Sequence, residues 1–116
     1  MFISVGTKPR IVTPLQALSA TSPNSATFKC EVDPGDPLPT VQWFKGGREI
    51  RASRKYAVTY ANRTATLVVK ETTVDDDAVY MCSVDNRVGR VDTEAQLTVN
   101  GKTLKPYMYI ISCIAY

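Results

Sequence analysis

A tyrosine and a cysteine two residues apart, Tyr80 and Cys82, form the most constraining feature of this sequence. Because strand side chains alternate between two faces, both point to the same side of one strand. Cys30 and Trp43 lie upstream, in the alternating runs Ala-Thr-Phe-Lys-Cys-Glu-Val and Val-Gln-Trp-Phe. The alternation therefore predicts three strands, each of which turns one or two of these residues toward a shared core.

The rest of the chain repeats the same period of two. Four further runs, at residues 10–13, 56–60, 64–70 and 91–99, are interpreted as strands, and apolar residues alternate most clearly in the last two. No segment shows helical periodicity. Pro14 interrupts the first run, so residues 15–19 are expected to continue on a second sheet. Val74 is expected to close one end of the core. A chain of 116 residues suits one such domain, and the sequence predicts an all-β sandwich.

Five motifs then occur in a fixed order. They are Gly-Asp-Pro-Leu-Pro at 35–39, Trp-Phe-Lys at 43–45, Leu67, Asp-x-Ala-x-Tyr-x-Cys at 76–82 and Asn-x-x-Gly at 86–89. Together they resemble the I-set immunoglobulin family, especially the modules of giant muscle proteins such as titin, twitchin and obscurin. The resemblance implies a Greek-key β-sandwich over residues 9–100. It also implies that the Tyr80 hydroxyl bonds to backbone at a corner fixed by Asp76.

The same resemblance implies a structural core: Cys30, Trp43, Leu67, Asp76, Tyr80 and Cys82. In this family Cys30 and Cys82 face each other across the two sheets and could form a disulfide. In a reducing cytosol we expect them to remain small buried thiols, as in the muscle modules. Cys113, near the carboxyl terminus, has no obvious partner.

Two segments lie outside the predicted domain. Residues 1–8 are interpreted as a flexible lead-in. Residues 101–116 end in the uncharged run Tyr-Met-Tyr-Ile-Ile-Ser-Cys-Ile-Ala-Tyr, which matches no strand of the family and is too short to span a bilayer. Such a segment is typical of aggregation-prone sequence. We interpret it as a tail of non-native origin, with a docking peptide or the start of a membrane segment as alternatives.

The residues that most enzymes and cofactor sites need are missing from the sequence. It contains no histidine, which is the commonest general base and metal ligand, and no phosphate-binding glycine loop. Its net charge of +3 is too small to indicate a nucleic-acid binder. We therefore predict no enzymatic activity, no cofactor, no metal site and no nucleic-acid partner.

Three acids at residues 75–77 have a functional and a structural interpretation. They could bind calcium, but consecutive carboxylates cannot all point at one ion. We prefer a turn in which Asp76 fixes the corner or pairs with a base such as Arg54 or Lys55.

A group of bases and a short triplet also allow two interpretations. The bases could meet an acidic partner or a phosphoinositide surface, but we favour a solvated strand edge that discourages aggregation between strands. They are Lys45, Arg48, Arg51, Arg54 and Lys55. Asn62-Arg63-Thr64 is a glycosylation acceptor triplet, which matters only in a secreted chain.

Three hypotheses of function remain. The first is a structural and protein-interaction module, one immunoglobulin link of a sarcomeric or cytoskeletal muscle protein, whose partners are other proteins and neighbouring modules. The second is an extracellular recognition domain of an adhesion molecule or receptor, since fold alone does not separate the two classes. The third is an accessory module of a giant muscle kinase. The amino terminus lacks the features of a secretory signal, which favours a cytoplasmic location.

Overall fold

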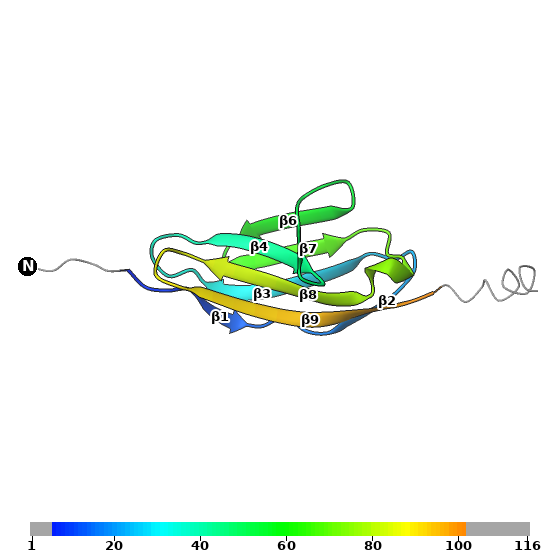
Figure 1. The fold of residues 1–116 in the computed structure, drawn as a ribbon, viewed down its shortest axis with the longest axis horizontal. Helices are drawn as coiled ribbons and strands as arrows, with labels where there is room; N and C mark the ends of the chain where they lie inside the picture. The colour runs from blue at the N-terminus through cyan, green and yellow to red at the C-terminus, as the bar shows by residue number, and fades with distance from the viewer. Residues whose placement is uncertain (1–5, 102–116) are drawn as a thin grey trace, which may run out of the picture.

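The computed structural model describes residues 6–101, which form two β-sheets packed face to face (Figure 1). The four-stranded sheet has the spatial order β1 (Arg10–Thr13), β3 (Ala26–Asp33), β7 (Thr64–Val69) and β6 (Tyr56–Ala61). The five-stranded sheet has the order β2 (Leu18–Thr21), β9 (Arg90–Asn100), β8 (Ala78–Asp85), β4 (Thr40–Lys45) and β5 (Arg48–Ile50). A short 3₁₀ helix, η1 (Val74–Asp76), precedes β8. This arrangement confirms the predicted Greek-key β-sandwich.

Strict alternation on β3 and β7 builds one wall of the core. Phe28 lies opposite Leu67 in the antiparallel register and Cys30 lies opposite Ala65, and all four side chains are buried. The side chains between them point outward, as the period of two requires. The facing wall comes from the other sheet, and its fully buried members are Trp43, Tyr80, Cys82, Val84 and Leu97.

The first strand crosses from one sheet to the other at Pro14, as expected. β1 pairs with β3 in the four-stranded sheet, whereas β2 pairs with β9 in the five-stranded sheet. The expected boundaries of the second segment, 15–19, were wrong, because β2 begins only at Leu18. Leu15 instead lies between the sheets with 5% of its surface exposed, and its N–H donates to Thr93 Oγ1 at 3.1 Å. At the crossing, this backbone N–H therefore bonds to a side chain and not to a neighbouring strand.

Val74 does not close the end of the sandwich, which corrects the expectation from the sequence. Its side chain is 62% exposed, whereas Thr72 is fully buried and its hydroxyl donates to the Asn24 carbonyl. The cause is a capping box at the start of η1: the Thr73 hydroxyl accepts from Asp75 N, and the Asp76 carboxylate accepts from Thr73 N. This reciprocal bonding sets the direction of the turn and leaves Val74 on its solvent side.

Two tight connections follow the turn chemistry that their residues predict. Gly46 and Gly47 join β4 to β5 with φ values of +55° and +85°, which residues other than glycine rarely adopt. Residues 86–89 join β8 to β9, and the N–H of Asn86 donates to the Gly89 carbonyl at 3.0 Å.

The described chain enters and leaves at opposite ends of the sandwich. In Figure 1 the segment before β1 lies at the left end, and β9 runs to the right end. β2 and β9 are parallel neighbours, whereas every other strand pair in residues 6–101 is antiparallel. The second half of the split first strand, β2, therefore lies beside the last strand, β9, and runs in the same direction.

Candidate functional site

The centre of the sandwich holds two thiols and an indole. Cys30 on β3 and Cys82 on β8 are free cysteines with 1% and 0% exposure, and Trp43 on β4 is the register partner of Cys82. The hydrogen bond to Cys30, together with burial, raises the pKa of the Cys82 thiol. Because the thiolate is the reactive form, a thiol held neutral in this way is a packing group and not a nucleophile.

A second buried group, Asp76, lies at the corner before β8. Its carboxylate accepts from Lys55 Nζ at 2.7 Å and from Thr73 N at 2.8 Å, and Lys45 Nζ lies 3.6 Å away. Burial opposes ionisation, but these hydrogen bonds and the two lysine charges outweigh it and hold the pKa of Asp76 below its usual value. Of the two bases proposed from sequence, Lys55 makes the pair. Lys45, from β4, is an additional partner that the sequence did not indicate.

Tyr80 connects this corner to the core. Its hydroxyl donates to the Asp76 carbonyl at 2.8 Å, and its ring lies 5.2 Å from the ring of Phe28. The side chain is fully buried, and burial raises the pKa of its hydroxyl. The geometry matches the backbone bond that the resemblance implied.

Removing the hydroxyl alone should be mildly destabilising. Tyr80→Phe keeps the ring but leaves the Asp76 carbonyl without this donor, so the free energy of unfolding should fall by about 0.5–1.5 kcal/mol in urea titration. Tyr60→Phe, at a side chain that is 36% exposed, is the matched control and should change it by less than about 0.5 kcal/mol. Equal effects in the two variants would contradict the role of the buried hydroxyl.

Asn86 has a role that the sequence did not reveal. Its amide donates to the carbonyls of Thr7 at 2.8 Å and Pro37 at 3.0 Å, and its side-chain oxygen accepts from the N–H groups of Val88 and Gly89. One side chain therefore ties the incoming chain and a loop to the β8–β9 connection. The sequence signal was an asparagine at the start of a four-residue turn, which indicates local bonding but not the two distant carbonyls.

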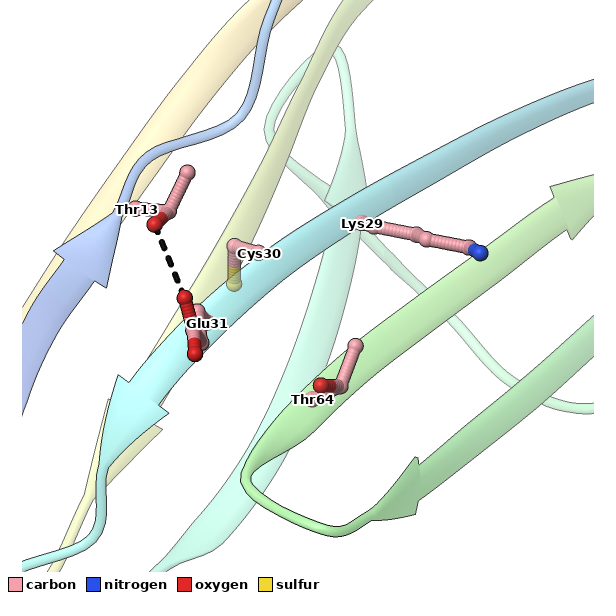
Figure 2. Close-up of a pocket in the computed structure, with 5 residues that line it drawn as sticks. All are labelled: Thr13, Lys29, Cys30, Glu31 and Thr64. Carbon is pink, nitrogen blue, oxygen red and sulfur yellow. Dashed lines mark hydrogen bonds between the residues drawn. The ribbon is translucent and has the colours of Figure 1, made fainter.

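A hollow of about 200 Å³ lies beside β3 and is lined by five residues: Thr13, Lys29, Cys30, Glu31 and Thr64 (Figure 2). It forms where the β1–β3 register shifts between Ile11 and Thr13. Thr13 Oγ1 donates to Glu31 Oε1 at 3.0 Å across it. Glu31 is bonded to Thr13, and no hydrogen bond joins the buried Cys30 thiol to Lys29 or Glu31, so the residues that line the hollow do not form an activated nucleophile. We interpret the hollow as a packing feature of the split first strand.

The acidic triplet and the Asn62 triplet lie in two separate turns. Residues 75–77 do not converge, since Asp77 accepts from the N–H of Val99 while Asp76 faces the lysines. No cluster of three potential metal ligands occurs within residues 6–101. Asn62 lies exposed in the β6–β7 turn, where its triplet is accessible. The part of the chain that the structure describes also contains no helix long and apolar enough to cross a bilayer.

Two sheets in Greek-key order, a split first strand, a tryptophan beside two facing cysteines and a tyrosine corner define an immunoglobulin-type sandwich. The immunoglobulin I-set domain model matches residues 9–99. The chain therefore belongs to the immunoglobulin I-set family.

Three other proteins have sequences similar to this chain. Titin of Drosophila melanogaster is 32% identical over 91 residues, covering 78% of this chain and, to the nearest per cent, 0% of that protein. The muscle M-line assembly protein unc-89 of Caenorhabditis elegans is 34% identical over 107 residues, covering 89% and 1%. Roundabout homolog 1 of Mus musculus is 37% identical over 97 residues, covering 84% and 6%. The chain thus spans only a small part of each relative.

Solved structures of titin domains have the same fold. Titin domain M7 superposes with a TM-score of 0.80 and 32% identity, covering 84% of this chain and 98% of that one. The titin M10–obscurin-like 1 immunoglobulin complex gives a TM-score of 0.79 at 27% identity, covering 83% and 97%. One module of this kind therefore corresponds to the whole described domain.

Proposed function

We propose that this chain is a structural and protein-interaction module, one link of a sarcomeric or cytoskeletal muscle protein, and that it carries load along its first and last strands. The observation that carries the proposal is the parallel β2–β9 pair in a domain whose ends lie at opposite poles. Force applied to the two ends pulls β2 and β9 past each other. All the hydrogen bonds between them must then break together, whereas an antiparallel hairpin pulled from one end opens bond by bond.

The similarity to titin and unc-89 and the two free buried cysteines support this role. Buried thiols fit a reducing compartment, where disulfides are rare. The titin M10–obscurin-like 1 complex shows that a domain of the same fold contacts another protein. We accordingly propose a cytoplasmic location, neighbouring modules and other proteins as partners, and a domain of residues 9–100 with 101–116 outside the fold. Of this last segment, residues 102–116 lie outside the described part of the chain.

The direction of the backbone groups identifies which bonds bear the load. Ser22 N donates to the Asn100 carbonyl at 3.0 Å, whereas the carbonyl of Thr21 faces the other way and accepts from Asn24 N at 2.8 Å. Because these directions alternate along a strand, the N–H of Ala20 points toward β9 and the N–H of Ser19 points away from it. The two positions therefore offer a matched pair of proline substitutions.

Ala20→Pro should lower the force at which the domain ruptures when it is stretched between handles at its two ends. The substitution removes one donor from the loaded ladder and leaves a β9 carbonyl unpaired, so the free energy of unfolding should also fall by about 1–3 kcal/mol. Ser19→Pro loses only an N–H at the free sheet edge, where proline is tolerated. Its rupture force should stay close to that of the parent chain. Equal rupture forces in both variants would contradict the proposed load path.

An extracellular recognition domain is the second candidate, and the similarity to Roundabout homolog 1 favours it. The exposed triplet at Asn62 would accept a glycan in that setting. Expression of the native gene in animal cells separates the two: secretion with a glycan on Asn62 would overturn the muscle proposal. A module of a giant muscle kinase is a third candidate, in which the catalytic residues belong to another domain.

A further inference from the structure

The outer face of the five-stranded sheet carries an apolar cluster that the core does not use. Phe44 on β4 lies opposite Met81 on β8, and Met81 lies opposite Glu94 on β9, so the three side chains form a row across the sheet. Val79 extends the cluster by one step along β8 and is 42% exposed. Their neighbours Trp43 and Tyr80 point into the core, so this cluster lies on the opposite, solvent-facing side.

The cluster lines a groove. Its walls are Phe44, Val79, Met81 and Glu94 together with the Gly46–Gly47 turn, and its volume is about 340 Å³. The space beside both glycines is open, because a Cβ added to either one would meet no atom within 4 Å. The turn therefore bounds the groove without closing it. We call this feature the Phe44–Glu94 groove. It has an apolar floor and one carboxylate at its rim.

The outer face of the five-stranded sheet has a charge opposite to that of the whole chain. Lys45 and Arg48 flank the glycine turn at one end of the groove, but their register positions belong to the inner face of the sheet. The outward positions of β4, β5, β8 and β9 carry four carboxylates and one base: Glu49, Asp85, Asp92, Glu94 and Arg90. Arg90 pairs with Asp92 at 2.9 Å, and Arg51, beyond the end of β5, pairs with Glu49 at 3.4 Å. Glu94 makes no ion pair within the described residues. An acidic face on a chain of net charge +3 favours a basic partner.

We propose that the Phe44–Glu94 groove docks a segment of a partner protein that presents an apolar side chain next to a lysine or arginine. The apolar side chain covers Phe44, Val79 and Met81, and the cation pairs with Glu94. Burial of the central apolar contact supplies the affinity, and the rim charge selects the partner and its orientation. This proposal goes beyond load bearing and does not depend on it, because the groove lies on β4, β8 and β9 and does not include β2.

The test is a titration of the ¹⁵N-labelled full chain with the peptide Gly-Phe-Lys-Leu-Lys-Gly, followed by amide chemical shifts. Shifts should concentrate on Phe44, Val79, Met81 and Glu94 and on the glycine turn. The matched peptide Gly-Phe-Glu-Leu-Glu-Gly should bind at least about fivefold more weakly, because its charges repel the rim. Met81→Ser and Glu94→Lys should each weaken binding of the basic peptide by a similar factor, and the spectrum of each variant shows that it is folded.

Two substitutions on the opposite sheet serve as controls. Glu31→Lys repeats the charge reversal on β3, and Val68→Ser replaces an outward apolar side chain of β7 by the same hydroxyl, and both should leave the affinity within about twofold. Shifts spread over both sheets, equal losses in the control variants or no binding at millimolar peptide would overturn the proposal. Self-association of the chain through the groove would also overturn it, since the occupant would then be a second copy.

Discussion

Trp43→Ala should destabilise the domain by about 3–5 kcal/mol, a large part of the about 5–15 kcal/mol that holds a domain of this size together. Trp43 is 1% exposed and contributes the largest fully buried side chain. Its indole Nε1 makes no hydrogen bond within the described residues, so its contribution is packing alone. Alanine would leave a cavity beside Cys82 and Ile50, its register partners on two strands. Urea titration monitored by circular dichroism measures the loss.

Phe44→Ala is the matched control for this substitution. Phe44 is the next residue of the same strand, but its side chain lies on the outer face and is half-buried. Its removal opens no internal cavity and should cost about 1–2 kcal/mol. A comparison of the two variants thus distinguishes the stability contributed by packing in the core from that contributed by packing on the surface. An unchanged unfolding midpoint in Trp43→Ala would show that the core is not organised around the indole.

The core could be predicted because its signals are local. The period of two around Cys30, Trp43, Tyr80 and Cys82 already states which side chains face inward, and the structure buries all four. The resemblance then supplied the order of the strands, which periodicity alone does not fix. Trp43 and Phe44 also show what periodicity leaves undetermined. Their alternation implied an outward aromatic side chain, but only the register places it opposite Met81 and Glu94.

The details that sequence reasoning missed depend on contacts between distant segments. Lys45 reaches Asp76 because β4 pairs with β8 in the same sheet, which places Lys45 opposite Tyr80 and close to the corner before β8. The Thr7 and Pro37 carbonyls both lie within reach of Asn86 because the incoming chain pairs with the loop through the Thr7–Asp36 bridge. Val74 was expected inside because it is apolar, but the capping box decided its direction. Local hydrogen bonds outweighed the burial of one valine.

Asp76→Asn should be the most damaging polar substitution. The carboxylate is 4% exposed, and it accepts from Lys55 and Thr73 while Lys45 lies within ion-pair distance. Asparagine keeps the shape but removes the charge, which leaves two lysines facing a neutral amide. Both lysines are partly solvated, with side-chain exposures of 25% and 34%, so the expected cost lies at the lower end for a broken buried pair, about 2–3 kcal/mol.

The pH dependence gives this prediction a second measurement. Because the folded-state pKa of Asp76 lies below its unfolded value of about 3.9, its contribution to stability is complete above that value. The contribution is lost as the pH falls through the folded-state pKa, since protonation then removes the charge in both states. The difference in unfolding free energy between the parent chain and Asp76→Asn should therefore be constant near neutral pH and shrink below about pH 4.

Asp75→Asn distinguishes the buried carboxylate from its neighbours in the same acidic triplet. The Asp75 side chain is exposed, and Lys45 bonds to its backbone carbonyl, which the substitution retains. This variant should stay within about 0.5 kcal/mol of the parent chain at neutral pH. If Asp76→Asn and Asp75→Asn were equally stable, or if the loss in Asp76→Asn were the same at pH 3 and pH 7, the ion pairs at the corner would not stabilise the fold. The corner would then depend on the capping box and the Tyr80 hydroxyl alone.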